Sequence, residues 1–438
     1  MKAPSLITRK AYQNRVLRLL ENDDLLFVFG MRRAGKSCLI ESLSEQLSNR
    51  SAWEGALIRI DAEEARWRNV AADDLIKRFD AAYDPATRNV VIADELGCIG
   101  DWERAAEHMA SKPGVKLVIL SSNRRVLSEK LSLVREGRYD IVDVLPLSLD
   151  EFIAMHGIKE LTSAVTPAHA KRFRDEDGNQ LSAGELLELY LTESSVPPIA
   201  GERLGDPRAH INADGRYSAA IVHDILETSF TAGLSAITAQ ALLACIISVL
   251  AGSMGRNVSA TWVGKQTPLY LDRPSSTKTV ESYIRAVVSS NLFCVAERYD
   301  IKADQKLKTL MKYYFSDLGV YRLIMGRQQE DHSAALESRV FFELLRRGYE
   351  VCNGKFGEEE VRFMAVHGHN RVYVKTADVF RERDRRLLLS PLRKIKDNHP
   401  KVIIVSDTET RTTNDGILIL NAVEFFLGGS WERIRPIY

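Results

Sequence analysis

The sequence predicts an α/β fold whose N-terminal part is a parallel β-sheet covered by helices on both faces. From Leu25 to about Pro146, short apolar runs alternate with amphipathic helical patterns. Continuous apolar runs are typical of strands buried on both faces, and the helices between them supply the crossovers that parallel strands require. A glycine-rich segment follows the first run, at the edge of the sheet where such folds bind ligands.

The elements of this first domain, residues 1–155, follow in a regular order. Apolar runs predict strands at 25–29, 56–60, 90–93, 116–120 and 141–145. Apolar residues at helical spacing predict helices after Ser37, around Leu75 to Phe79 and around Trp102 to Met109.

Composition excludes several classes of protein. A chain of 438 residues is too long for one core and predicts about two to four domains. Lys+Arg 60 against Asp+Glu 59 leaves a net charge of +1, which gives no global argument for nucleic acid. Five scattered cysteines without C-x-x-C spacing are typical of a reducing compartment. Because we find neither a secretory signal nor a run of the ~20 apolar residues that a membrane span needs, we expect a cytoplasmic protein.

An eight-residue segment after the first strand fits the phosphate-binding pattern G-x-x-x-x-G-K-[ST]. Its glycines let successive backbone N–H groups point at the phosphates, Lys36 places a cation on the β- and γ-phosphates, and the Ser37 hydroxyl ligates Mg²⁺. A chance turn is the alternative, but a buried strand precedes the segment and an amphipathic helix follows it. The predicted nucleotide-binding residues are Gly30, Met31, Arg32, Arg33, Ala34, Gly35, Lys36, Ser37 and Cys38.

Two adjacent acids follow the predicted strand at 90–93. Asp94 is expected at the carboxyl edge of the sheet, where it holds Mg²⁺ through its water shell. Glu95 points elsewhere and is expected to act as the general base that polarises the attacking water. Acids also cap ordinary strands, but the combination with the phosphate-binding segment favours a hydrolytic site.

Three further residues are candidates for the same site. Ser122 and Asn123 follow the next strand and are placed to sense the γ-phosphate, although a turn that uses Ser and Asn explains them equally well. Arg138 is a candidate for a charge-neutralising arginine, in the same chain or from a neighbouring subunit, and a plain surface arginine is the alternative. We find no N-K-x-D guanine-binding pattern, so ATP is the expected nucleotide.

The middle of the chain changes character. Residues 156–235 are predicted to be a helical connector, and residues 236–325 contain three helical patterns followed by two strands with a basic turn. This order is that of a winged helix-turn-helix, which predicts Lys278 and Arg285 as exposed DNA contacts. A winged-helix lid that packs on the ATPase domain is the alternative, because this fold is widely reused.

Residues 326–438 return to mixed α and β, with the layout of a restriction-endonuclease-like core. Metal-dependent cleavage in that core needs an Asp on one strand and E-x-K on the next. Arg362 stands at the place of the Asp and Tyr373 at the place of the acid, so that only Lys375 remains. A cation repels the metal, which argues against nuclease activity. Glu337 and Glu343 on the preceding helix are expected to be structural or solvated.

The chain resembles prokaryotic ATP-binding proteins that join an AAA-type P-loop domain to a winged helix and to a C-terminal domain related to PD-(D/E)xK nucleases. The similar segments are GMRRAGKS at 30–37, ADEL at 93–96 with Trp102, SSN at 121–123, EGRYDIVDVLPLSLDEF at 136–152, RYDIKADQKLKTLMKYYFSDLGVYR at 298–322, LESRVFFELLRRGYEV at 336–351, and LRKIKDNHPKVIIVSD at 392–407 followed by Asp415-Gly416-Ile417. The resemblance implies ATP and Mg²⁺ as ligands. Gly97, Arg362, Tyr373 and the Ser195-Val196-Pro197 segment depart from the family pattern.

From the sequence we therefore expect a Mg²⁺-dependent ATPase whose nucleotide state changes how the accessory domains present themselves to a partner. The alternative is an ATP-switched DNA-binding regulator or defence component, and an active nuclease is a third possibility that Arg362 disfavours. DNA and another protein are both candidate partners. The sequence leaves the oligomeric state open.

Overall fold

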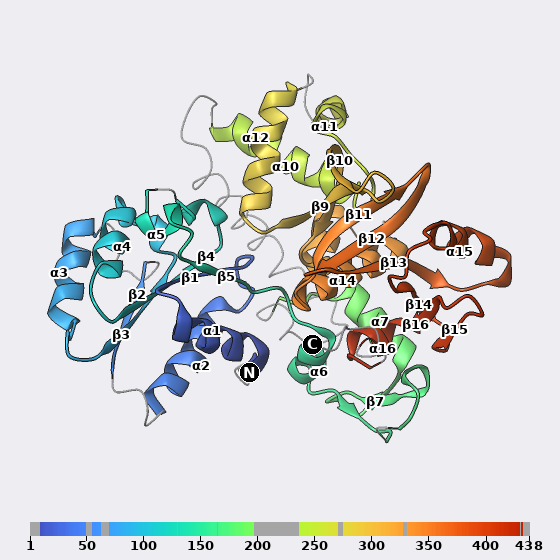
Figure 1. Ribbon diagram of the computed structural model, residues 1–438, viewed down its shortest axis with the longest axis horizontal. Coiled ribbons are helices and arrows are strands. Elements are labelled where there is room, and N and C mark those ends of the chain that lie inside the picture. The colour runs from blue at the N-terminus through green and yellow to red at the C-terminus, as the bar shows by residue number, and fades with distance from the viewer. Residues whose placement is uncertain are drawn as a thin grey trace. The chain divides into compact units, whose positions relative to one another are not determined.

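The computed structural model describes residues 9–49, 55–62, 70–128, 130–163, 165–196, 236–269, 275–326, 331–429 and 431. The chain divides into two compact units (Figure 1). Unit 1 comprises Met1–Pro146 with Ser289–Asn291, and unit 2 comprises Leu147–Val288 with Leu292–Tyr438. Within the described residues, no helix is both long and apolar enough to cross a bilayer.

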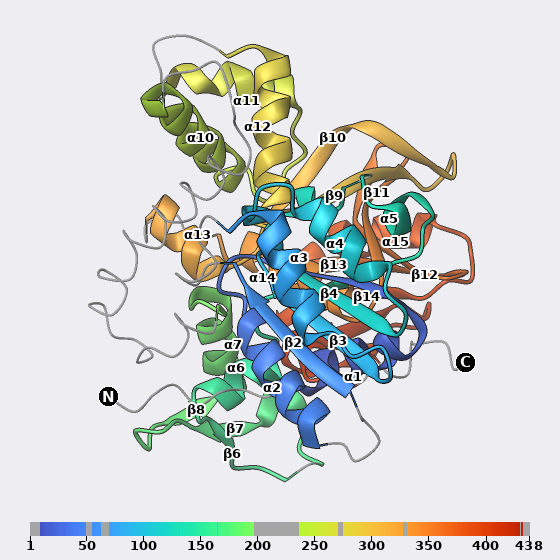
Figure 2. The same cartoon turned by 90° about the vertical axis from the view of Figure 1, so that its left-hand side faces the viewer.

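Unit 1 contains the predicted parallel sheet. Its five strands, β1 (Leu25–Phe29), β2 (Gly55–Asp61), β3 (Arg88–Asp94), β4 (Val115–Ser121) and β5 (Asp140–Asp143), lie in the order β2-β3-β4-β1-β5. All four neighbouring pairs are parallel, and the strands β2, β3 and β4 are seen side by side in Figure 2. Every residue of β1 is buried, as expected for a strand covered on both faces.

Helices cover both faces of this sheet. They are α1 (Lys10–Asn22), α2 (Lys36–Asn49), α3 (Ala72–Ala82), α4 (Trp102–Ala110) and α5 (Ser132–Arg135), with the short 3₁₀ turns η1 (Leu96–Cys98) and η2 (Arg124–Val126). Leu75 of α3 and Met109 of α4 share one core with Phe27 of β1. Because side chains alternate along a strand, Leu26 and Val28 face the other side. Helix α1 packs there on β1 and β5.

Unit 2 contains a small antiparallel sheet within residues 156–235, where the sequence predicted a helical connector. The prediction of helices is therefore wrong for the three strands of this sheet. After α6 (Leu149–Met155) come β6 (Lys159–Glu160), η3 (Ala168–Ala170), β7 (Arg172–Arg174), β8 (Gln180–Ser182) and α7 (Ala183–Thr192). In β7, buried Phe173 is flanked by two exposed arginines. Three residues are too few for this alternation to be recognised among charges. The remainder of the connector, 197–235, lies outside the described residues.

Three helices and a hairpin follow, in the predicted order. They are α10 (Ala236–Ala251), α11 (Ala260–Gln266) with η4 (Thr267–Leu269), α12 (Thr277–Ser289), β9 (Phe293–Asp300) and β10 (Gln305–Phe315). The hairpin does not stand alone, because β9 pairs in parallel with a strand of the C-terminal region at Arg298↔Asn353. The predicted domain boundary at 325 therefore separates strands that belong to one sheet.

That sheet has eight strands in the order β10-β9-β11-β12-β13-β14-β16-β15. The C-terminal strands are β11 (Glu350–Phe356), β12 (Glu359–His367), β13 (Asn370–Val379), β14 (Lys401–Asp407), β15 (Arg411–Thr412) and β16 (Leu418–Asn421). The helices are α13 (Leu318–Met325), α14 (His332–Arg346), α15 (Arg385–Lys394) after η5 (Glu382–Asp384), and α16 (Ala422–Phe426). Leu389 and Leu392 of α15 pack with Tyr373 on one face, and Phe341 of α14 packs with Phe363 on the other.

Candidate functional site

The phosphate-binding segment forms a tight loop between β1 and α2. A Cβ atom on Gly30 would lie 2.5 Å from the carbonyl oxygen of Val144, so only glycine permits this close approach of two backbones. Arg33 and Gly35 have left-handed φ angles of 64° and 92°. Helix α2 then begins at Lys36, which leaves its first N–H groups free of intrahelical partners. The loop thus has the backbone geometry of an anion-binding helix terminus.

Lys36 is the buried cation of this loop, with 6% of its surface exposed. Its Nζ donates to the carbonyl oxygens of Gly30 at 2.9 Å and Met31 at 3.3 Å. The same nitrogen lies 3.8 Å from Oε1 of Glu95. The ammonium group is therefore held over the concave side of the loop, where it can exchange carbonyl partners for phosphate oxygens.

Ser37 and Asp94 come together at the same edge of the sheet. The Ser37 hydroxyl donates to Oδ2 of Asp94 at 2.9 Å. Burial, the neighbouring Glu95 and, to a smaller extent, Asp61 raise the pKa of Asp94 to about 6. The hydrogen bond from Ser37 and the charge of Lys36 lower this pKa but do not offset the rise. A hydroxyl and a carboxylate in a region with excess negative charge are oxygen donors that suit Mg²⁺.

Glu95 is directed away from Asp94 by its backbone. Its φ of 47° and ψ of 38° are left-handed, so the chain turns directly after β3. The carboxylate accepts the Ser121 hydroxyl at 3.1 Å and the Ser122 backbone N–H at 2.7 Å. Two adjacent acids therefore have different partners, which is the separation that the sequence analysis expected.

The structure brings Ser121, rather than the Ser122 and Asn123 side chains, to Glu95. Ser122 contributes its backbone N–H to Glu95, and the Asn123 carboxamide oxygen accepts the N–H of Arg125 at the start of η2. The Asn123 N–H donates to the Ser121 hydroxyl at 3.1 Å. The Asn123 oxygen thus caps η2, as the alternative interpretation expects, and a role of Ser122 or Asn123 toward the γ-phosphate stays a prediction. The register Asp94↔Leu120 explains why Ser121 lies beside Glu95, and only the pairing of β3 with β4 reveals it.

Arg138 lies at the opposite edge of the sheet. It precedes β5, and its guanidinium contacts Asp24 at 3.4 Å and Glu136 at 3.1 Å. Asp24 precedes β1, whereas Gly30 follows it, so the length of a five-residue strand, about 17 Å, separates Arg138 from the phosphate-binding loop. This corrects the same-chain version of the Arg138 prediction; only a role toward a neighbouring subunit stays a prediction.

Sequence reasoning missed two arginines near the loop. Arg9, with 3% of its surface exposed, donates from Nη1 to the Ala34 carbonyl oxygen at 3.0 Å and lies over the Tyr12 ring. Arg124 pairs with Asp143 and lies 5.0 Å from the centroid of the Phe29 ring. Neither residue belongs to a recognisable pattern. Both are identified only because α1 and η2 pack at this edge of the sheet.

The raised pKa of Asp94 predicts a pH-dependent stability of the nucleotide-free protein. In the window between its ordinary pKa of 3.8 and about 6, the folded state binds more protons than the unfolded state, so stability falls as pH rises. We expect Asp94→Asn to raise the free energy of unfolding by about 1–2 kcal/mol at neutral pH and by little near pH 4, after allowance for partial solvent screening. Urea titrations at both pH values measure this; a difference independent of pH would contradict it.

Lys278 and Arg285, the predicted DNA contacts, are both exposed on α12. A spacing of seven residues places them on the same face of the helix. In the β9–β10 hairpin, Lys306 is engaged by Glu297 at 2.9 Å and Glu350 at 2.7 Å. The basic turn of the predicted wing is therefore partly neutralised within unit 2.

The predicted nuclease position is occupied by a buried charge cluster. Arg362 Nε lies 3.1 Å from Oε2 of Glu337, whose Oε1 accepts Lys312 at 3.1 Å and the Tyr314 hydroxyl at 2.6 Å. Lys312 and Arg362 also both contact Glu360. Glu337 is structural, as expected, since only 2% of its surface is exposed. Lys312 and Arg362 thus pair with Glu337 and Glu360, the carboxylates that a metal would need as ligands.

Lys375 and Glu343 also have structural partners. Pro391 lies inside α15. Because proline has no N–H, it cannot donate the helical hydrogen bond to the carbonyl oxygen of Leu387, one turn earlier. Lys375 Nζ donates to that oxygen at 3.4 Å. Glu343 pairs with Arg346 and Arg347 on its own helix.

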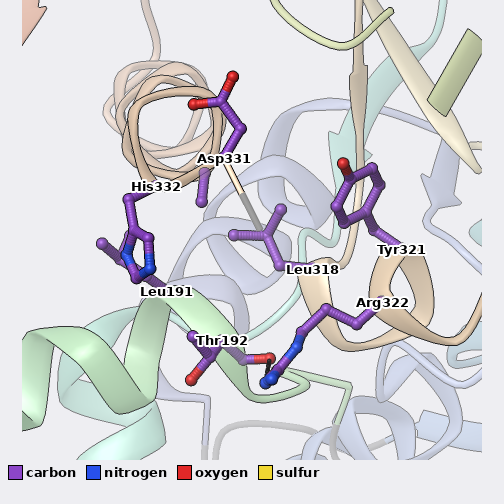
Figure 3. A pocket seen from close by; sticks show the side chains of 8 residues that line it. Leu191, Thr192, Leu318, Tyr321, Arg322, Asp331 and His332 are labelled. Carbon is purple, nitrogen blue, oxygen red and sulfur yellow. Dashed lines mark hydrogen bonds between the residues drawn. The ribbon is translucent and has the colours of Figure 1, made fainter. Parts of the chain in front are cut away.

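A small pocket in unit 2 lies where α7, α13 and α14 meet (Figure 3). Its polar groups tie these helices together. Arg322 Nη1 donates to the Thr192 carbonyl oxygen at 2.9 Å, and His332 Nδ1 lies 3.3 Å from Oε2 of Glu188. These contacts hold the three helices together around a pocket of about 20 Å³.

Comparison with known proteins supports the interpretation of unit 1. Residues 22–153 match a family described as an AAA domain. The N-terminal part of the chain is therefore an AAA-type P-loop ATPase domain.

The likeness to whole proteins extends beyond that domain. A Haemophilus influenzae protein described as uncharacterized is 26% identical over 428 residues, 97% of this chain and 99% of its own length. The uncharacterized protein MJ1544 of Methanocaldococcus jannaschii is 21% identical over 426 residues, 94% of this chain and 89% of its own. The shared region thus includes unit 2.

Two solved structures are similar at 14% sequence identity. The Walker-type ATPase PABY2304 of Pyrococcus abyssi has a TM-score of 0.48 and covers 72% of this chain and 95% of its own. The AMPPCP-bound DnaA from Aquifex aeolicus has a TM-score of 0.30 and covers 64% of this chain and 87% of its own.

Proposed function

We propose that this protein, whose N-terminal part is an AAA-type P-loop ATPase domain, binds ATP with Mg²⁺ and hydrolyses its terminal phosphoanhydride bond. One observation carries the proposal: Asp94 contacts the Ser37 hydroxyl at 2.9 Å, whereas the carboxylate of Glu95 lies 3.8 Å from Lys36 Nζ. Adjacent acids with separate partners suit separate roles, a cation ligand and a general base.

In this mechanism the loop N–H groups and Lys36 bind the phosphates. Lys36 exchanges the carbonyl oxygens of Gly30 and Met31 for β- and γ-phosphate oxygens. Ser37 and Asp94 would hold Mg²⁺, which neutralises charge on the phosphates. Glu95 accepts a proton from water as the new bond to the γ-phosphorus forms and the bond to the β-phosphate oxygen breaks, releasing ADP and phosphate.

We further propose that the nucleotide state changes how unit 2 presents itself to a partner. The order of α10, α11, α12 and the β9–β10 hairpin supports the winged-helix interpretation of residues 236–325. Helix α14 beside β11, β12 and β13 supports the nuclease-like interpretation of the C-terminal region. Nuclease activity is not proposed, because Arg362 lies 3.1 Å from Glu337, where a catalytic metal would need room.

Replacement of Lys36 tests the ATPase proposal. We expect Lys36→Ala to lower Mg²⁺-dependent phosphate release on the order of 10²–10³-fold, because the loop loses the cation aimed at the transferred phosphoryl group. Phosphate release from ATP by the purified full chain is the measurement. Lys77→Ala, which removes a lysine with 77% of its side chain exposed in the same unit, is the matched control. Equal turnover of wild type and both variants would refute the assignment.

A second candidate is an ATP-switched DNA-binding regulator or defence component. It is favoured by one observation, the exposed Lys278 and Arg285 on a single face of α12. We expect salt-dependent affinity for duplex DNA that weakens in a Lys278→Ala/Arg285→Ala variant. Affinity that does not respond to salt or to these substitutions would count against it.

A further inference from the structure

A basic hollow lies beside α15 in unit 2. It has a volume of about 510 Å³ and is lined by Phe356, Arg386, Ser390, Arg393, Lys394 and Lys396. Four of these six side chains are cations and none is an acid. The hollow is therefore a concentrated positive surface on a chain whose net charge is only +1.

The packing of α15 exposes this basic face. Leu389, Leu392 and Ile395 recur at helical spacing, and all three are buried in the core of the C-terminal sheet. Arg386 and Arg393 lie two turns apart on the outer face and are exposed, with Ser390 between them. The same amphipathic pattern that anchors the helix thus presents the cations outward.

Some of the cations are neutralised within the protein and others are not. Arg393 binds Asp415 through Nε at 2.5 Å and Nη2 at 3.1 Å, and Lys394 pairs with Glu359. Arg386 and Lys396 are exposed, and neither forms an ion pair with any described acidic side chain. At least two positive charges of the hollow are therefore available to an external anion.

The surrounding sequence reinforces the charge. Residues 381–401 contain the cations Arg381, Arg383, Arg385, Arg386, Arg393, Lys394, Lys396 and Lys401 and the acids Glu382, Asp384 and Asp397. This short segment has more than twice as many cations as acids, whereas the whole chain is nearly balanced. A local field of this sign attracts polyanions.

We propose that the hollow beside α15 binds the phosphate backbone of duplex DNA. Arg386 presents planar donors that suit phosphate oxygens, and Lys396 adds a compact ammonium group on a flexible stem. Arg386 lies in the first turn of α15 and Lys396 lies two residues beyond its end. Because a duplex carries one charge per about 1.7 Å of axis, these two cations reach different phosphates. The site reads charge and not base sequence.

The lining distinguishes this partner from others. Single-strand binders need successive aromatic side chains on which bases stack, but the hollow has only Phe356, which is half-buried. A protein partner needs apolar anchors at the centre of the interface, and cations occupy that place here. Duplex DNA fits a charged hollow that lacks a stacking platform.

The experiment measures binding of a fluorescent duplex of about two helical turns to the full chain at several salt concentrations. An Arg386→Ala/Lys396→Ala variant removes the two cations that form no ion pair with a described acidic side chain. A Lys159→Ala/Arg174→Ala variant is the matched control, because it removes two exposed cations from the small sheet of the same unit. ATP turnover of each variant is measured in parallel.

We expect the hollow variant to lose on the order of tenfold in affinity at low salt, and its log–log salt slope to fall by about 1.8, or 0.9 per lost contact. The control variant should match wild type, and ATP turnover should be the same in all three proteins. An unchanged slope in the hollow variant would overturn the proposal, as would wild-type protein that fails to bind duplex DNA at about 50 mM salt.

Two further probes separate the partners. Single-stranded RNA and polyglutamate are each compared with the duplex. If either binds more tightly than the duplex, and if the hollow variant loses that binding, the surface belongs to that partner and the proposal is overturned. DNA binding by the hollow does not require ATP hydrolysis, so equal ATP turnover by wild type and the Lys36→Ala variant would not contradict it. The Lys278→Ala/Arg285→Ala variant tests the surface of α12 separately.

Discussion

Replacement of Glu95 by glutamine is expected to reduce ATP turnover by about 10²–10⁴-fold while leaving ATP binding nearly unchanged. Glutamine keeps the shape of the side chain, and its carbonyl oxygen can still accept the Ser121 hydroxyl that now lies 3.1 Å from the carboxylate. It cannot accept a proton from water. Phosphate release and the affinity for a fluorescent ATP analogue, measured on the same preparation, separate the two effects.

The matched control for this prediction is Glu45→Gln, which changes an exposed acid on α2. It should leave turnover and binding at wild-type values. Ser121→Ala should lower turnover less than Glu95→Gln does, because the Ser122 N–H at 2.7 Å still orients the carboxylate. Turnover by Glu95→Gln within a few-fold of wild type would remove Glu95 from the role of general base.

The Glu337→Gln substitution is expected to destabilise the protein by about 3–5 kcal/mol. Glu337 accepts contacts from Lys312, Tyr314 and Arg362, and Lys312 has 0% of its surface exposed. Loss of the negative charge leaves two cations in the cluster with only Glu360 as a counter-charge. Water cannot compensate Lys312 at that depth, so the cost of its burial appears in the free energy of unfolding.

Urea titration followed by circular dichroism measures this change. Glu358→Gln, which alters an exposed acid beside β12, is the control and should lie within about 0.5 kcal/mol of wild type. A loss below 1 kcal/mol in Glu337→Gln would mean that the cluster does not hold the C-terminal sheet together. ATP turnover by any protein that remains folded should be unaffected, since the cluster belongs to unit 2.

Much of unit 1 was predictable because its signals are local. Five apolar residues in a row give the fully buried β1, and the loop pattern beginning at Gly30 is contiguous in the chain. Asp94 is the last residue of β3 and Glu95 follows it directly, so the sequence identifies both before any pairing of strands is known. By contrast, β7 has only three residues, too few to show an alternation among charged neighbours.

Residues whose roles depend on strand pairing were not predictable. Ser121 reaches Glu95 because β4 pairs with β3. Arg9 reaches the Ala34 carbonyl because α1, which it precedes, packs on β1 and α2, the two elements that flank the loop. Arg138 was a candidate because it precedes a strand in sequence. The parallel register Leu26↔Asp140 places it at the wrong edge for the same-chain site.

The sequence by itself determined the phosphate-binding loop, the acid pair and the alternation of strands and helices, because each is encoded by neighbouring residues. Only the tertiary structure decided which polar groups surround Glu95. It alone also showed that Arg362 and Lys312 form a charge cluster with Glu337. It also decided that one face of α15 is buried while Arg386 and Lys396 stay exposed. Such contacts join residues far apart in the chain, and their energies depend on burial, which no local pattern records.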